Sequence, residues 1–209
     1  MSKTKGSNES KQILASSGEF FSEVVDEALE SRKIKTYPMV SKYIVDLLEH
    51  YLFTDNLYDT HDESGRKQRS TLAEMLLTAS SSTQNEKIKL LKKLGDSSLY
   101  ISGFFAPSLR RKPIDVGYYV NMGCTAYNSL SLTIKETTFS KVYSEISNRF
   151  VEFVDVLTYI RDKSLVSPNQ DLLELMEIYN QTGSSLAREE LIKNGVMTVS
   201  NDKVVGKKQ

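Results

Sequence analysis

The side chains best suited to chemistry lie in and just after one unusual stretch, GDSSLYISGFFAPSLRRKP. Asp96 and Tyr100 stand four residues apart in it, so they share one face if the stretch is helical. A buried carboxylate beside phenols could act as a base or anchor a ligand. With residues from the next helical segment, the candidate pocket for a small ligand comprises Asp96, Tyr100, Tyr118, Tyr119 and Asn121.

The same stretch is also suited to close packing between helices. Small side chains recur every four residues in two adjoining rows, Gly95, Leu99 and Gly103, then Ser98, Ser102 and Ala106. Gly123 and Ala126 offer a matching small face in the next segment. A packing joint is therefore our first interpretation, and a ligand pocket is the alternative.

Two basic clusters are candidates for binding an acidic partner. One lies on a face of an amphipathic helix and comprises Lys87, Lys89, Lys92 and Lys93. The other is a loop triplet, Arg110, Arg111 and Lys112, in which arginine could hold a carboxylate or phosphate through paired hydrogen bonds. Basic and acidic residues both number 27, so the net charge is zero and general attraction to nucleic acid is not expected. Another protein is the expected partner.

The histidines and the cysteine do not form a recognised metal or catalytic site. His61 stands in an acidic segment, but the spacing of its neighbours does not match an EF-hand loop. His50 is expected to face solvent at the end of a helix, and Cys124 to be a buried, unreactive thiol. Signatures of phosphate loops, zinc proteases and serine hydrolases are absent from the sequence. We therefore expect no cofactor and no metal, and we assign no catalytic residue.

Helical spacing of apolar residues dominates the elements that would position these groups. Predicted helices run from about 17 to 33, from Pro38, from capping boxes at Thr71 and Thr83, after Asp115, over 137–163, from Ser167 to Gly183 and up to Gly195. The segment 137–163 is predicted as one long helix whose apolar stripe, Phe139 to Ile160, forms the central core. Residues 54–70 are interpreted as a loop.

These elements predict an all-α protein, a single irregular bundle of about seven or eight helices with a short extended segment near the C-terminus. We expect a disordered tail over 1–15, one domain over 16–199 and a flexible tail over 200–209. No apolar run is long enough for a membrane span, and residues 1–15 lack the apolar core of a secretory signal. With a single cysteine, these features predict a cytoplasmic protein with no membrane association.

Three segments carry a family resemblance: LGDSSLYISGFFAPSL, DVGYYVNMGCTAYNSLS and YNQTGSSLAREELIKNGV. Over roughly residues 37 to 197, the chain resembles an uncharacterised family of all-helical proteobacterial proteins. The resemblance implies a helical bacterial protein of the cytoplasm and supplies no catalytic residues.

Two classes of function follow from these patterns. The first is a non-enzymatic interaction or regulatory module, because charged helix faces are present and catalytic motifs are missing. The alternative is a small-ligand-binding protein or helical enzyme with a pocket around Asp96, Tyr100 and Tyr119. Amphipathic helices could also pair between two copies of the chain, so the sequence leaves a homodimer open.

Overall fold

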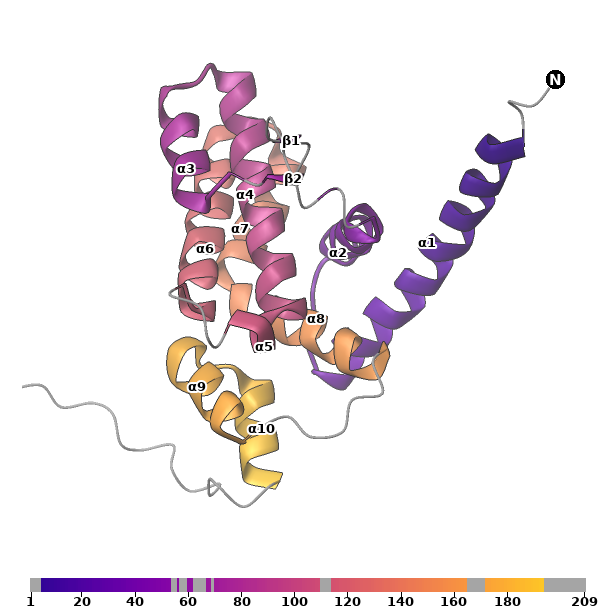
Figure 1. The fold of residues 1–209 in the computed structure, drawn as a ribbon, viewed down its shortest axis with the longest axis vertical. Helices are drawn as coiled ribbons and strands as arrows, with labels where there is room; N and C mark the ends of the chain where they lie inside the picture. The colour runs from indigo at the N-terminus through magenta and orange to yellow at the C-terminus, as the bar shows by residue number, and fades with distance from the viewer. Residues whose placement is uncertain are drawn as a thin grey trace, which may run out of the picture.

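The computed structural model describes residues 5–53, 56, 60–61, 67–68, 70–109, 114–164 and 172–193, and side chains there except for 5–17, 60–61, 67–68, 164, 172–174 and 177. The helices are α1 (Lys5–Ser31), α2 (Pro38–Tyr51), α3 (Leu72–Ser81), α4 (Gln84–Phe104), α5 (Ala106–Leu109), α6 (Val116–Thr133), α7 (Thr137–Asn148), α8 (Phe150–Ser164), α9 (Leu172–Thr182) and α10 (Ser185–Lys193). The predicted all-α class is confirmed (Figure 1).

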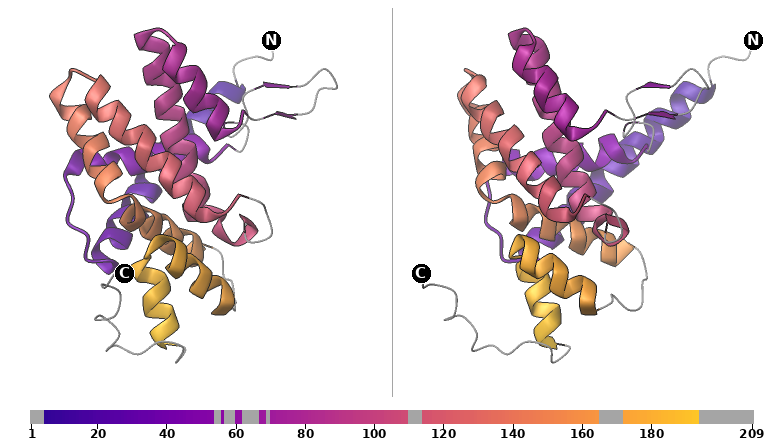
Figure 2. Two further views of the ribbon diagram at one scale, coloured as in Figure 1. Left: turned by 90° about the vertical axis from the view of Figure 1, so that its left-hand side faces the viewer. Right: turned by 60° about the vertical axis from the view of Figure 1, so that its left-hand side comes forward.

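One short pair of strands departs from the prediction of a loop over 54–70. Strand β1 (Thr60–His61) pairs antiparallel with β2 (Lys67–Gln68), with Thr60 opposite Gln68. The hairpin lies at one side of the helical bundle (Figure 2).

The centre of the bundle is an antiparallel pair, α4 and α6. Helix α3 packs along α4, α7 packs along α6, and α8 crosses the lower end (Figures 1 and 2). Helix α2 lies against α4 and α7, while α1 contacts α2 and α8. Helices α9 and α10 form a hairpin that packs beneath α6 and α8.

Several predicted helix ends are confirmed by their hydrogen bonds. The Thr71 backbone N–H donates to the Glu74 carboxylate at 2.8 Å, and the Glu74 N–H donates to the Thr71 hydroxyl at 3.2 Å. Asp115 Oδ1 accepts from the Tyr118 N–H at 2.9 Å. Gly183 ends α9 with a φ of 69°, a conformation that glycine adopts without strain. The predictions at Ser167, at Gly195 and over the C-terminal extended segment and tail lie outside the described residues.

The prediction of one long helix over 137–163 is wrong, because the chain breaks at Arg149. This residue leaves the helical region with φ −121° and ψ 28°, and α8 turns away from α7 across the end of the bundle (Figure 1). Its guanidinium donates to the Glu145 and Glu152 carboxylates and to the Lys35 carbonyl, which supports the bend. The predicted apolar stripe from Phe139 to Ile160 is buried only from Val142 onward, and Phe139 is exposed.

Helix α1 starts earlier than the sequence predicted. It begins at Lys5, within the stretch expected to be a disordered tail, and continues without interruption past residue 17, where the helix was predicted to start. Residues 5–15 hold two lysines and one each of glutamate, glutamine, leucine and alanine, which favour helices, but also one glycine, one asparagine and two serines, so helix propensity alone did not place the start.

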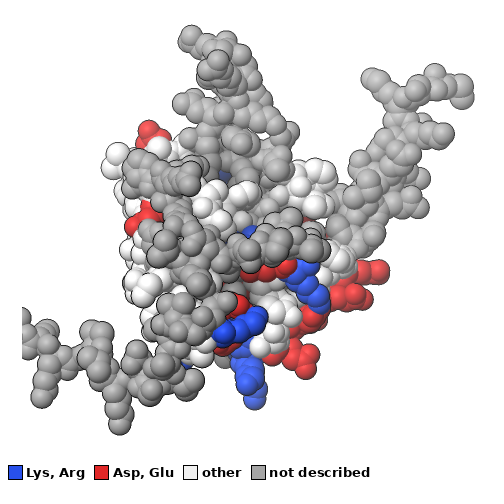
Figure 3. All heavy atoms as spheres, turned by 60° about the horizontal axis from the view of Figure 1, so that its bottom comes forward, with Lys and Arg blue, Asp and Glu red and all other residues white. Residues whose placement is uncertain are grey.

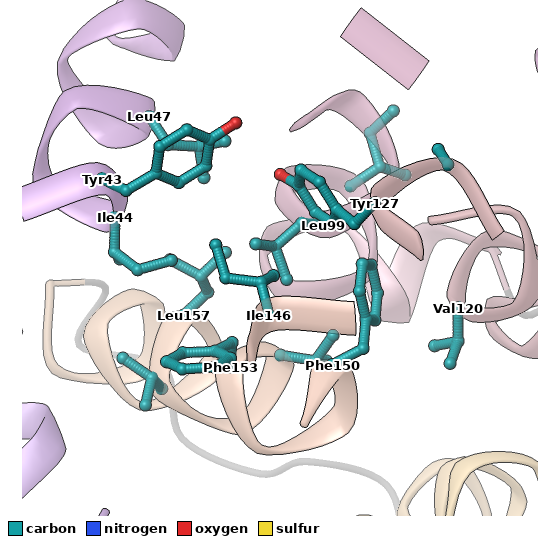
Figure 4. Close-up of a cluster of buried hydrophobic side chains, with 14 of the residues drawn as sticks. Tyr43, Ile44, Leu47, Leu99, Val120, Tyr127, Ile146, Phe150, Phe153 and Leu157 are labelled. Atoms are coloured by element: carbon teal, nitrogen blue, oxygen red, sulfur yellow. The ribbon is translucent and has the colours of Figure 1, made fainter. Parts of the chain in front are cut away.

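The core lies where α2, α4, α6, α7 and α8 meet. Figure 4 shows Tyr43, Ile44 and Leu47 of α2 facing a group of side chains from the other helices, Leu99, Tyr127, Ile146, Phe150, Phe153 and Leu157. A smaller cluster, Leu175, Ala187 and Leu191, lies within the α9–α10 hairpin.

Candidate functional site

The small-residue face of α4 is a packing joint, as the first interpretation predicted. A Cβ atom on Gly103 would lie 2.4 Å from Cβ of Leu157, and one on Gly123 would lie 2.3 Å from Cζ of Phe150. A Cβ atom on Gly95 would lie 2.8 Å from the ring of Tyr127. All three distances are too short for a side chain, so these glycines allow α6 and α8 to approach α4 closely.

Asp96 lies inside this joint and is 5% exposed. Its Oδ1 atom accepts hydrogen bonds from the hydroxyls of Tyr127, at 2.7 Å, and Tyr43. Its Oδ2 atom accepts from Nζ of Lys92 at 2.5 Å. One carboxylate therefore connects α2, α4 and α6, and both of its oxygens have partners.

A third tyrosine completes the cluster around Asp96. The ring of Tyr143, on α7, stacks on Tyr127 at 5.8 Å between centroids and meets Tyr43 edge to face at 5.5 Å. Lys92 Nζ lies 5.1 Å from the centre of the Tyr43 ring, within range of a cation–π interaction. We call Asp96, Lys92, Tyr43, Tyr127 and Tyr143 the tyrosine cluster.

The phenols of the tyrosine cluster hold their protons strongly. Burial, followed by the negative charge of Asp96, raises the pKa values of Tyr43 and Tyr127 well above 10.0. The same two causes raise the pKa of Tyr143 to about 12. The phenols are therefore hydrogen-bond donors at neutral pH, and the cluster is arranged to join helices.

Alkaline pH should weaken the fold through these phenols. The pKa of Tyr143 is about 12 in the folded chain, whereas the ordinary value for tyrosine is 10.0. The contribution of this phenol to the free energy of unfolding is therefore complete below pH 10 and is lost as the pH rises through 12. Urea unfolding between pH 9 and pH 12 should show a steeper loss of stability in the wild type than in Tyr143→Phe. Equal slopes in the two proteins would contradict this assignment.

The other predicted pocket residues do not gather around Asp96. Tyr100 lies in an aromatic stack between Tyr51 and Phe104, with centroid distances of 4.6 and 4.8 Å. Tyr118 and Tyr119 meet each other edge to face, about two helical turns along α6 from Tyr127. Asn121 is exposed on α6.

The partners of Asp96 were missed by the sequence reasoning. Tyr43 belongs to the apolar row of α2 and Tyr127 lies on α6, so neither is near Asp96 in the sequence. The one local signal was the four-residue spacing of Lys92 and Asp96, which permits an ion pair on a helix.

The predicted basic face of α4 is smaller than expected, because Lys92 is bound to Asp96. Lys93 is half-buried, and burial lowers its pKa. Lys89 is exposed and Lys87 half-buried at the N-terminal end of the face. Arg110, Arg111 and Lys112 lie outside the described residues.

The remaining reactive side chains take ordinary positions. His50 is exposed in the last turn of α2, as predicted. Cys124 was predicted to be a buried, unreactive thiol and is half-buried; burial raises the pKa of its thiol, which disfavours the reactive thiolate. The part of the chain that the structure describes contains no group of three or more histidine, cysteine or carboxylate side chains that could hold a metal ion.

A second buried carboxylate, Asp155 of α8, anchors the α9–α10 hairpin. It accepts hydrogen bonds from the hydroxyls of Ser184 and Ser185 at 2.5 and 3.0 Å and from the Leu186 N–H at 3.1 Å. Burial raises the pKa of Asp155, and these bonds oppose that effect. The adjoining cavity measures about 20 Å³, so it has no room for a ligand larger than a water molecule.

An open groove lies between α1 and α2. This groove has a volume of about 760 Å³ and is lined by Gly18, Ser22, Asp26, Leu29, Ile34, Lys35, Thr36, Pro38, Ser41, Lys42, Val45, Asp46 and Glu49. Asp26 accepts from the Ser41 hydroxyl across it, and Lys42 pairs with Asp46. We call this opening the α1–α2 groove.

Charged side chains also gather on the lower face of the molecule, where acidic residues stand beside fewer basic ones (Figure 3).

Within the described residues, no helix has the length and apolar character needed to cross a membrane. No known protein family, curated protein or solved structure matches this chain.

Proposed function

We propose that this chain is a non-enzymatic protein-interaction module with a regulatory role in the bacterial cytoplasm. The observation that carries the proposal is the α1–α2 groove, which is open to solvent and has both apolar and charged residues in its wall. Leu29 and Val45 form a largely buried apolar floor, while Asp26, Asp46 and Glu49 supply carboxylates. Such a mixed lining suits a protein segment better than a small apolar ligand.

The groove favours a partner with basic residues. Its three carboxylates stand beside two lysines, and one of these, Lys42, already pairs with Asp46. Because Asp46 is paired with Lys42, a basic helix or peptide would form its ion pairs with Asp26 and Glu49 along the rim.

The tyrosine cluster offers less support for the alternative of a ligand-binding protein or enzyme. Both oxygens of Asp96 accept hydrogen bonds from the protein, and the ring of Tyr127 occupies the space above Gly95. Asp96 does not line the α1–α2 groove. A ligand would have to displace Tyr43 or Tyr127 to reach the carboxylate.

Affinity capture tests the proposal with two charge-reversed proteins. The full chain is used as bait in an extract of the cells that produce it, and captured proteins are quantified by mass spectrometry. Asp26→Lys with Glu49→Lys should reduce recovery of a specific partner at least about tenfold, because two attractive contacts become repulsive.

The control changes charge by the same amount but in the opposite direction on the basic face of α4. Lys87→Glu with Lys89→Glu also tests whether that face, predicted from the sequence, binds a partner. If one variant no longer captures a protein that the wild type captures, and its helicity by circular dichroism is unchanged, the substituted surface is the one that binds that protein. Identical protein lists for the wild type and both variants would contradict the proposal.

A further inference from the structure

The α9–α10 hairpin has a small apolar core of its own. Leu175, Ala187 and Leu191 pack together in a cluster that is separate from the main core of the bundle. The hairpin lies at the lower end of the molecule, beneath α6 and α8 (Figure 1). Its helices contain 11 and 9 residues, lengths at which an isolated helix is only marginally stable in water. The hairpin therefore depends on its contacts with the bundle to stay helical.

The first of these contacts is a helix cap supplied by α8. The Ser184 hydroxyl, just before α10, accepts from the Ala187 N–H at 3.1 Å and donates to Asp155. The Asp155 carboxylate also accepts from the Ser185 hydroxyl and from the Leu186 N–H. A carboxylate is favourable at this end of a helix, because it accepts from free N–H groups and faces the positive end of the helix dipole. Asp155 thus holds the first turn of α10 on α8.

The second contact is Arg32, which follows α1. Its guanidinium donates to both oxygens of the Glu189 carboxylate, at 2.7 and 3.2 Å, and to the Ser185 hydroxyl at 3.1 Å. The side chain of Glu189 is 61% exposed, so water competes for this ion pair. The buried Nε atom of Arg32 has no hydrogen-bond partner among the described residues. The docked hairpin therefore leaves one buried donor unsatisfied, which lowers the free energy needed to undock it.

The apolar contact between the hairpin and the bundle is incompletely filled. The cavity of about 20 Å³ beside Asp155 lies at this contact. Apolar side chains of both parts line it, among them Ala106, Val116 and Val154 of the bundle and Leu175 and Leu186 of the hairpin. Atoms that line a void lose the contacts that a filled space would give them. Docking therefore depends more strongly on the two polar contacts, at Asp155 and Arg32.

We infer that the α9–α10 hairpin is a reversible cover, which undocks as one unit while α4, α6 and α8 stay folded. Asp155 and Arg32 let go together, because both bind Ser185 in the first turn of α10. Undocking uncovers Val116 and Val154, which are 5% and 4% exposed in the docked state. The protein then has a closed state and an open state, and the open state presents an apolar face beside a carboxylate.

Native-state hydrogen exchange of the full chain tests this cover. In the wild type, amides in the middle of α9 and α10 should exchange at least about tenfold faster than those of α4 and α6, because undocking exposes them without global unfolding. The same amides should exchange at least about tenfold more slowly than those of an unfolded chain, because the hairpin is docked most of the time.

Two substitutions should favour the open state selectively. Asp155→Asn leaves one accepting oxygen in place of two, so exchange throughout α9 and α10 should become about tenfold faster. Arg32→Met keeps the aliphatic part of the side chain and removes its donors, so the same amides should exchange about fivefold faster. Exchange in α4 and α6 should be unchanged in both variants. Lys163→Met is the matched control, because it breaks a different ion pair, between α8 and Glu27 of α1, and it should leave exchange in the hairpin unchanged.

Three results would overturn the cover. Equal opening free energies for the hairpin and for α4 and α6 in the wild type would mean that the hairpin opens only when the whole chain unfolds. Unprotected amides throughout α9 and α10 of the wild type would mean that the hairpin is not docked. Exchange that accelerates in α4 and α6 as much as in the hairpin of the variants would mean that Asp155 and Arg32 support the bundle as a whole.

Discussion

Asp96→Ala should lower the free energy of unfolding by about 3 kcal/mol, because it leaves two buried tyrosine hydroxyls without their acceptor. Tyr43 and Tyr127 both donate to Oδ1 of Asp96. Both rings are buried between helices, so a water molecule cannot easily replace the carboxylate. The substitution also removes the counter-charge of Lys92. Urea denaturation at neutral pH, followed by circular dichroism, measures the change.

Single substitutions of Tyr127 and Lys92 measure how much each partner of Asp96 contributes to this loss of unfolding free energy. Tyr127→Phe removes one donor and should cost about 1 kcal/mol. Lys92→Met should cost less than about 1 kcal/mol, since its side chain is 47% exposed and the ion pair is partly screened. If Asp96→Ala changed stability by less than about 0.5 kcal/mol, within the usual range for surface substitutions, the carboxylate would not be what joins these helices.

Gly103→Ala should destabilise the chain by about 2 kcal/mol, although alanine usually stabilises a helix interior by about 1 kcal/mol relative to glycine. The new methyl group would lie 2.4 Å from Cβ of Leu157, an atom bonded directly to the α8 backbone. No rotation of the Leu157 side chain can move that atom, so α4 and α8 would have to separate. The Gly103 carbonyl also accepts from the Thr158 hydroxyl and from Arg161, and both bonds would be disturbed.

Matched substitutions separate this clash from the general effect of replacing glycine. Gly117→Ala should keep or slightly raise stability, because its nearest neighbour, Asp115 Oδ1, would be 3.4 Å from the new Cβ. Gly123→Ala should be partly rescued by Phe150→Leu, since its clash is with the end of the ring. Leu157→Ala should not rescue Gly103→Ala, because alanine retains Cβ. A fully stable Gly103→Ala protein would contradict the packing joint.

Local signals in the sequence were sufficient for much of the fold. The capping residues Thr71 and Asp115 and the terminating Gly183 depend on contacts within a few residues, and the structure confirms all three. The close-packed face of α4 was also predicted, because glycine and serine spaced by helical turns leave little side chain between two backbones. Helical periodicity therefore determined the class of the fold and the face on which α4 packs.

The break at Arg149 could not be predicted in the same way. Its flanking residues continue the helical period, and what supports the bend is a hydrogen bond to the carbonyl of Lys35, from a distant part of the chain. The extension of α1 was missed for a different reason, since its first turns contain glycine, asparagine and serines, whose low helix propensity does not predict a helix there.

By itself, the sequence determined the all-α class, where several helices begin or end, and that Asp96 stands beside small residues suited to packing. Only the tertiary structure decided that Tyr43 and Tyr127 satisfy Asp96, that Tyr100 belongs to an aromatic stack, and that Lys92 is bound inward. The physical reason is the distance along the chain between the residues that interact. Caps and helical periods depend on neighbours within one or two turns, whereas the partners of a buried carboxylate come from helices that meet only when the core forms.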